Sequence, residues 1–210
     1  MIRILIADDH AIVREGLKQI VADTPDMVVG GEAADGPQVL ELVRKDDWDV
    51  VVLDIAMPGR GGVDILKQLK NEKPGLPVLI LSMYPEEQYA VRCLRAGASG
   101  YLTKESAPDE LVTAVQKVVS GGKYVSSLLA ERLAFELEID TEKPLHEALS
   151  DREYQVMCMM ASGKTVTEIA DNLSLSIKTI STYRSRILEK MDMTSSAELM
   201  HYAIKHGLAE

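Results

Sequence analysis

Short runs of apolar residues recur along the first part of the chain, and each is followed by a stretch with helical spacing. The run VVVL is apolar at every position, which is typical of a strand buried on both faces. In the helical stretches, apolar residues return every three or four positions. The expected strands are residues 2–7, 27–30, 49–53, 77–81 and 100–102. The expected helices are residues 13–21, 36–46, 61–72, 86–97 and 108–121.

This alternation of strands and helices predicts the architecture of residues 1–122. Consecutive strand–helix–strand units form right-handed crossovers, which produce a parallel sheet covered by helices on both faces. We therefore expect an α/β fold with a five-stranded, parallel, doubly wound sheet.

The pattern changes after Gly121-Gly122. Residues 123–148 are expected to be a linker that contains a helix over 126–139 and then a polar stretch with a proline. From Leu149 to the C-terminus, residues 149–210, only helical periodicity remains, which predicts a second, all-α domain. Its expected helices begin at a capping box of Ser150 and Glu153 and continue over 166–173, 177–191 and 196–205.

Two of these helices have the spacing of a helix-turn-helix. A short helix, a turn around residues 174–176 and a longer helix share an apolar face. Ala170 lets the two helices approach closely, and in this motif the second helix enters the major groove of DNA. A generic three-helix bundle has the same periodicity, so spacing alone leaves both interpretations open. The apolar face consists of Ile169, Leu173, Ile180 and Ile187.

Composition supports two globular domains. The chain has 210 residues, 46% of them hydrophobic and 27% charged, which is ordinary for chains that bury a core. No apolar run is long enough to span a membrane, and the N-terminal run meets Asp8 and Asp9 rather than a cleavage site. We therefore expect a cytoplasmic protein without a membrane partner. Cys93 and Cys158 lack metal-ligand spacing and are expected to be buried thiols.

The net charge of −10 argues at first against a nucleic-acid partner. The charge is unevenly distributed, however. Between Lys178 and Lys190 there are four basic residues and one acidic residue, Glu189. The second helix of the helix-turn-helix is therefore locally basic in an acidic protein.

Polar side chains end several of the expected strands. Because the carboxyl ends of parallel strands meet at one edge of a sheet, these side chains should converge there. Three carboxylates in one pocket raise each other's pKa unless a cation lies among them, and Mg²⁺ or Mn²⁺ suits oxygen ligands. A single aspartate at a strand end is equally well explained by turn preference, so the set is more informative than its members. The set is Asp8, Asp9, Asp54, Ser82 and Lys104.

The segments LIADDH, VVLDIAMPGRGG, LILS and GYLTK resemble the receiver domain of two-component response regulators, a flavodoxin-like fold. The resemblance covers about residues 1–121. It implies that Asp54 accepts a phosphoryl group from a sensor histidine kinase. It also implies that Asp8, Asp9, Asp54 and the backbone carbonyl of Ala56 hold Mg²⁺, while Lys104 contacts the phosphoryl oxygens.

The same resemblance implies that Ser82 and Tyr101 form a switch pair. In this family the hydroxyl turns toward the phosphoryl group, and the aromatic ring moves inward behind it. The alternative for Tyr101 is a half-buried strand tyrosine with its hydroxyl in water. This chain also departs from the family pattern, because Glu105 replaces a proline that often follows the lysine with a cis peptide bond. A cis bond before Glu105 would be costly.

Residues 149–206 resemble the LuxR/NarL-type DNA-binding domain, through the opening Ser150-Asp151-Arg152-Glu153, Glu168-Ile169-Ala170 and Lys178-Thr179-Ile180. The resemblance implies double-stranded DNA as a partner, with Lys178 and Arg186 on phosphates. The alternative for Arg184 and Lys190 is a solvated face. The expected DNA-contacting residues are Lys178, Thr179, Ser181, Thr182, Tyr183, Ser185 and Arg186.

The last helix resembles the family's dimerisation helix. The resemblance implies a homodimer, formed on phosphorylation or on DNA, in which Leu199, Met200 and Ala203 lie at the dimer contact. These residues and Ile204 could equally complete the core of one chain.

The leading hypothesis is a transcription regulator controlled by phosphorylation of Asp54, rather than a turnover enzyme. Two alternatives remain open. One is an aspartyl-phosphate hydrolase, against which Ala56 offers no second carboxylate. The other is a protein-interaction adaptor whose helical domain does not bind DNA.

Overall fold

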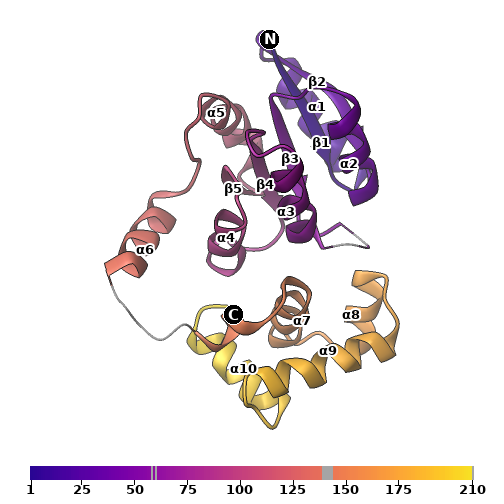
Figure 1. Cartoon of the computed structure of the whole chain (residues 1–210), viewed down its shortest axis with the longest axis vertical. Helices are drawn as coiled ribbons and strands as arrows, with labels where there is room; N and C mark the ends of the chain where they lie inside the picture. The colour runs from indigo at the N-terminus through magenta and orange to yellow at the C-terminus, as the bar shows by residue number, and fades with distance from the viewer. Residues whose placement is uncertain (58, 60, 139–143, 210) are drawn as a thin grey trace. The chain divides into compact units, whose positions relative to one another are not determined.

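The computed structural model describes residues 1–57, 59, 61–138 and 144–209, which form two compact units (Figure 1). The N-terminal unit is Met1–Ala134 and the C-terminal unit is Phe135–Glu210. Residues 139–143 of the expected linker lie outside the described residues, as do Pro58 and Arg60 of the motif that contains Asp54.

The N-terminal unit contains a five-stranded parallel sheet with the order β2-β1-β3-β4-β5. This confirms the doubly wound α/β fold. The order reverses between β1 and β3, and the crevice at such a point is where open α/β sheets bind ligands. The strands are β1 (Ile2–Ala7), β2 (Met27–Ala33), β3 (Val50–Asp54), β4 (Val78–Ser82) and β5 (Gly100–Thr103).

Strand β2 continues three residues beyond the expected end at residue 30. Its pairing with β1 shifts register between Ile4 and Leu5, so that Gly30 is passed over. Gly30 and its neighbour Gly31 both lie against the ring of Trp48. A Cβ atom on Gly31 would be 2.6 Å from Trp48 Cη2. Because glycine has no side chain, these two positions allow the indole ring to pack against the strand.

Helices cover both faces of the sheet. Helices α1 and α5 contribute Leu17, Val21, Leu111 and Val115 to a core with alternate residues of the strands. The other face receives buried residues of α2 and α3, such as Leu40 and Leu66. The helices are α1 (Ala11–Ala22), α2 (Gly36–Lys45), α3 (Gly62–Glu72), α4 (Glu86–Arg95) and α5 (Ala107–Val119).

The helices that follow are close to those expected. The linker helix is α6 (Ser127–Glu138), and a short 3-10 helix, η1 (Leu145–Ala148), occupies a stretch with no helical periodicity. Capping boxes form at Ser150 with Glu153 and at Thr165 with Glu168. The helices of the C-terminal unit are α7 (Asp151–Ala161), α8 (Val166–Leu173), α9 (Ile177–Lys190) and α10 (Ser196–Lys205).

The apolar face shared by α8 and α9 is buried as expected, because Ile169, Leu173, Ile180 and Ile187 form part of the core. Cys93 and Cys158 are both buried, and neither forms a disulfide. None of the described helices has the length and apolar character required to cross a membrane.

Candidate functional site

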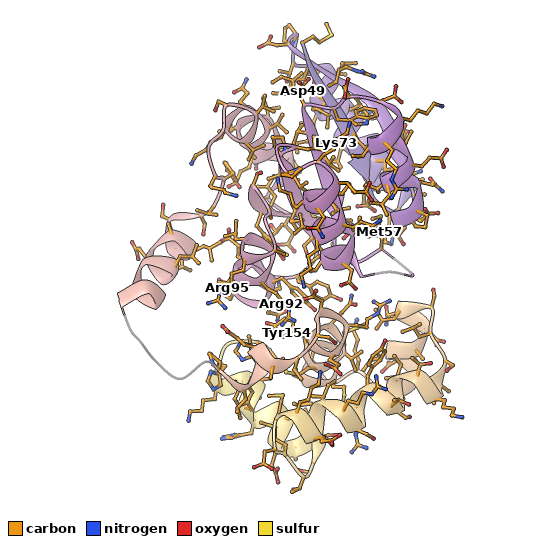
Figure 2. The ribbon with its side chains drawn as sticks, viewed as in Figure 1. Asp49, Met57, Lys73, Arg92, Arg95 and Tyr154 are labelled. Carbon is orange, nitrogen blue, oxygen red and sulfur yellow. The ribbon has the colours of Figure 1, made fainter. Side chains whose placement is uncertain are left out.

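An acidic pocket lies at the carboxyl ends of the central strands. Figure 2 labels residues before and after β3, Asp49 and Met57, and Asp54 is the last residue of that strand. Asp8 follows β1 directly, and both Asp8 and Asp54 are fully buried. Adjacent parallel strands therefore bring two carboxylates, 46 positions apart in sequence, to one edge of the sheet.

Lys104, the residue after β5, joins these two carboxylates. Its Nζ lies 2.7 Å from Asp54 Oδ2 and 2.7 Å from Asp8 Oδ2. The backbone amide of Lys104 donates to the carbonyl of Ser82 at 2.7 Å, which fixes the base of the side chain to the end of β4. Three of the residues expected from the sequence therefore meet in one pocket.

Asp9 and His10 complete the pocket. The Asp9 side chain is 29% exposed, and its Oδ1 lies 3.0 Å from His10 Nδ1. The backbone amide of His10 donates to Asp8 Oδ1 at 2.8 Å. His10 was not among the residues expected in this pocket, although its position directly after Asp8 and Asp9 is a signal that could have indicated it.

The donor atoms of this pocket fit a divalent cation. Ligand atoms of Asp8, Asp9, His10 and Asp54 all lie within 4.8 Å of one another. Three of the four residues supply carboxylate oxygens, the ligands that Mg²⁺ and Mn²⁺ prefer. The chemistry of the donor set therefore agrees with the metal expected from the sequence.

Burial sets the electrostatics of the pocket. Burial raises the pKa of Asp54 above its ordinary value, although the Lys104 ammonium and the backbone amide of Ala56 act in the opposite direction. That amide donates to Asp54 Oδ1 at 2.7 Å. Burial lowers the pKa of Lys104, but attraction to Asp54 and Asp8 outweighs it, so the net shift is upward. Lys104 therefore remains a cation at neutral pH.

Ser82 and Tyr101 are connected through the loop between β4 and α4. Ser82 is fully buried, and its Oγ accepts a hydrogen bond from the amide of Tyr84 at 3.0 Å. The Tyr101 hydroxyl donates to the carbonyl of Tyr84 at 2.8 Å. The Tyr101 side chain is buried, so the alternative of a half-buried tyrosine with its hydroxyl in water is wrong. Burial also raises the pKa of Tyr101, which keeps this donor protonated.

The loop after Lys104 is closed by side-chain hydrogen bonds. Thr103 Oγ1 accepts from the amide of Ser106 at 3.1 Å, and Ser106 Oγ donates to the carbonyl of Thr103 at 3.3 Å. Within the described ranges no peptide bond is cis, in agreement with the cost expected before Glu105.

The second candidate site is the outer face of α9. Ser174, in the turn before it, has a left-handed conformation with φ of 53°, and Ser176 caps α9 by accepting from the amide of Thr179 at 3.1 Å. Thr182 and Ser185 donate their hydroxyl protons back to helix carbonyls. The exposed residues of the expected set are Lys178, Ser181, Thr182, Ser185 and Arg186, and the half-buried ones are Thr179 and Tyr183.

Two basic residues of α9 are directed into the C-terminal unit instead. Arg184 Nε donates to Ser196 Oγ at 2.9 Å. Lys190 Nζ donates to Glu153 Oε2 at 2.6 Å. Solvation alone therefore does not describe either residue, because each side chain has a hydrogen-bond partner within the C-terminal unit.

The structure corrects the expected surface of α10. Leu199 and Ala203 are fully buried in the single chain and have no surface to offer to a second copy. The exposed apolar side chains of this helix are Met200, which is 37% exposed, and Ile204, which is 56% exposed. For Leu199 and Ala203, the alternative that they complete the core of one chain is therefore correct.

Comparisons with known proteins match each of the two units to a separate family. Residues 4–116 match the response regulator receiver domain family, and residues 147–203 match the luxR family of bacterial regulatory proteins. The chain is 36% identical over 209 residues to the response regulator UvrY of Escherichia coli (strain K12), covering 99% of this chain and 96% of that protein. It is 37% identical over 211 residues to the response regulator GacA of Pseudomonas aeruginosa, covering 100% of this chain and 99% of that protein.

A solved structure is also similar over nearly the whole chain. It is RcsB from Salmonella enterica serovar Typhimurium bound to promoter rprA in the presence of the phosphomimetic BeF3⁻. The TM-score is 0.65 with 27% sequence identity, and the match covers 96% of this chain and 98% of that chain. The chain therefore belongs to the two-component response regulators that combine a receiver domain with a LuxR-type DNA-binding domain.

Proposed function

We propose that this response regulator controls transcription through phosphorylation of Asp54 by a sensor histidine kinase. The observation that carries the proposal is the contact of Lys104 Nζ with both Asp8 and Asp54, at 2.7 Å each. This arrangement holds a buried carboxylate next to a fixed positive charge. A transferred phosphoryl group needs both of these at its acceptor.

In the proposed reaction an Asp54 carboxylate oxygen attacks the phosphorus atom of a phosphohistidine. The new oxygen–phosphorus bond forms as the phosphorus–nitrogen bond breaks, and the departing imidazole nitrogen takes up a proton from water. Asp8, Asp9, Asp54 and the carbonyl of Ala56 would hold Mg²⁺ or Mn²⁺, which when bound neutralises charge on the phosphoryl oxygens. Lys104 would move from its ion pair with Asp54 to those oxygens, because phosphorylation converts that carboxylate to an acyl phosphate whose negative charge lies on the phosphoryl oxygens.

Ser82 and Tyr101 would report the reaction to the rest of the domain. A phosphoryl group offers new acceptors to the Ser82 hydroxyl, which now accepts from the amide of Tyr84. Its rotation would also alter the support of Tyr101, which donates to the carbonyl of the same residue, Tyr84. A single added charge would thereby change the relative stability of two arrangements of the loop between β4 and α4.

The C-terminal unit is proposed to bind double-stranded DNA through the exposed face of α9. Lys178 and Arg186 would contact phosphates, where charge supplies affinity without reading sequence. Short hydroxyl side chains nearby would lie against base edges, where they discriminate weakly. The similarity to an RcsB structure that is bound to promoter DNA supports this proposal. The proposed contacts are Lys178, Thr179, Ser181, Thr182, Tyr183, Ser185 and Arg186.

We propose further that phosphorylation promotes a homodimer and that α10 contributes Met200 and Ile204 to it, since these are its exposed apolar side chains. The functional limits proposed for the chain are residues 1–122 for the receiver, 123–148 for the linker and 149–210 for the DNA-binding domain. The two compact units of the structure divide inside α6, after Ala134, which falls within this linker.

The phosphorylation proposal is tested by labelling the full chain with acetyl phosphate and Mg²⁺. We expect one phosphoryl group per wild-type chain and none on Asp54→Asn, while Asp26→Asn, a change of an exposed aspartate, serves as the matched control. Stoichiometric label on Asp54→Asn would refute the assignment. Multiple turnover of a phosphomonoester would instead favour the hydrolase alternative.

DNA binding is tested separately by measuring the affinity for duplex DNA at several salt concentrations. We expect affinity that falls with salt and rises when the receiver is phosphorylated. The absence of measurable binding to duplex DNA, with the receiver phosphorylated or not, would favour the adaptor alternative.

A further inference from the structure

Ser126 occupies a junction between the receiver and the linker helix. Its Oγ accepts from the amide of Leu129 at 3.1 Å, and its carbonyl accepts from the amide of Ala130 at 3.0 Å. Ser126 is therefore the N-cap of α6, which begins at the next residue. The hydroxyl proton of Ser126 is directed elsewhere, because it is donated to the carboxylate of Glu86.

Glu86 is the first residue of α4, and it holds Ser126 twice. Its Oε2 accepts from the Ser126 hydroxyl, and its Oε1 accepts from the Ser126 amide at 3.3 Å. Hydrogen bonds to a carboxylate are stronger than those between neutral groups. We name this pair of hydrogen bonds the Glu86–Ser126 clasp.

The segment before Ser126 is joined to β5. The carbonyl of Tyr124 accepts from the amide of Tyr101 at 3.1 Å, and the amide of Tyr124 donates to the carbonyl of Ser99 at 3.0 Å. The approach is close, since a Cβ atom on Gly100 would lie 2.6 Å from the carbonyl oxygen of Tyr124. The chain that enters α6 thus runs beside the strand that carries Tyr101.

These contacts close a ring that includes the proposed switch pair. From Ser82 the ring passes through Tyr84 to Tyr101 and on to Tyr124 by hydrogen bonds. Ser126 lies two residues after Tyr124 and is joined by the clasp to Glu86. Glu86 lies two residues after Tyr84, which closes the ring. A shift of Tyr84 therefore acts on the clasp both through β5 and along the loop into α4.

We propose that the Glu86–Ser126 clasp transmits phosphorylation of Asp54 to α6, and that phosphorylation opens it. The proposal rests on the proposed function, because it requires a phosphoryl group on Asp54. When the Ser82 hydroxyl turns to that group, its oxygen moves away from the Tyr84 amide and the start of α4 is released. Ser126 then keeps its cap on α6 but loses the receiver carboxylate that anchors the helix.

The opening is expected to loosen α6. This helix has 12 residues, and a helix of that length depends on external contacts, which here include the clasp and the buried side chain of Leu129. Loss of a charge-assisted anchor should raise hydrogen exchange of the amides over residues 127–131 about fivefold to tenfold. The signal would therefore reach the segment that leads to the DNA-binding domain as a change in the stability of its helix.

The experiment measures hydrogen exchange over residues 127–131 of the full-length protein, with and without acetyl phosphate and Mg²⁺. Ser126→Asp separates the clasp from the cap, because aspartate is a good N-cap but cannot donate a proton to Glu86 and is repelled by it. We expect this variant to exchange as fast without phosphorylation as the phosphorylated wild type does. The double variant Glu86→Lys with Ser126→Asp restores an attraction with reversed charges and should recover slow exchange.

Labelling of Asp54 is measured on the same samples, so that the two proposals fail separately. An unlabelled wild type would overturn the proposed function. A labelled wild type whose α6 exchange does not change would overturn the clasp and leave the proposed function intact. The clasp is also overturned if Ser126→Asp exchanges like unphosphorylated wild type, or if the double variant exchanges as fast as Ser126→Asp.

Discussion

Lys190, the last residue of α9, places its Nζ 2.6 Å from Oε2 of Glu153, the carboxylate that closes the capping box of α7. Burial raises the pKa of Glu153, but Lys190 and Ser150 lower it by more, so the pKa lies below the ordinary value of 4.5. A depressed pKa stabilises the folded state at pH values above about 4.5, and this contribution is lost as the pH falls through the folded pKa.

We therefore predict that Lys190→Met destabilises the C-terminal unit at pH 7. The expected loss is only about 1 kcal/mol, because the lysine is partly exposed and solvent weakens the ion pair. Below pH 4.5 the difference from wild type should shrink as Glu153 takes up a proton. Calorimetric unfolding of the full chain at several pH values measures both effects. Lys164→Met, which removes an exposed lysine, is the control, and an equal loss in that variant would contradict the prediction.

Lys178 and Arg186 should contribute to DNA binding through charge. Replacing either with alanine is expected to lower the slope of log affinity against log salt by about 1 and to weaken binding to all duplexes similarly. Arg184→Ala offers a matched contrast, because Arg184 donates to Ser196 within the C-terminal unit. Arg184→Ala should lower the thermal stability and leave the salt slope close to that of wild type. A lower salt slope with unchanged thermal stability would show that Arg184 contacts phosphates.

Lys104→Met should strengthen Mg²⁺ binding while it impairs the response to phosphorylation. The Lys104 ammonium now neutralises Asp8 and Asp54, so removing it leaves carboxylates that attract a divalent cation more strongly. Titration calorimetry should give a dissociation constant lower by about fivefold to tenfold, equivalent to about 1 kcal/mol. Lys45→Met, at an exposed position, should leave it unchanged. Weaker Mg²⁺ binding in Lys104→Met would mean that Lys104 organises the pocket rather than competing with the metal.

Leu199 and Met200 are neighbours on α10 with opposite expected effects. Leu199→Ala leaves a cavity in a fully buried position and should lower the free energy of unfolding by about 2–4 kcal/mol. Met200→Ser should change stability little and weaken self-association of the phosphorylated protein. Denaturant unfolding and analytical ultracentrifugation separate the two outcomes. Dimerisation that survives Met200→Ser together with Ile204→Ser would exclude α10 as the dimer contact.

The architecture of the receiver and the carboxylates and lysine of the acidic pocket follow from the sequence, whereas His10 was not expected there. Continuous apolar runs specify strands, and apolar residues that return every three or four positions specify helices. A chain of alternating strands and helices has few ways to form a sheet. Once the strands were placed, the position of Asp8 and Asp54 at one edge followed from the parallel direction of β1 and β3. The start of α7 was equally local, because its capping box joins Ser150 to Glu153, three positions later.

Which side chains meet between different elements depends on how those elements pack. Helix α10 has apolar residues at positions 199, 200, 203 and 204, and this stripe is too wide to show which of its edges faces the core. In the folded chain Leu199 and Ala203 are the buried ones. Lys190 and Glu153 are 37 positions apart, and Glu86 and Ser126 are 40 apart. Such contacts depend on the rotation of each helix about its axis and on the reach of long side chains. The periodicity of apolar residues gives neither the exact rotation of a helix nor the partner that a long side chain reaches. Both are set when the elements pack together.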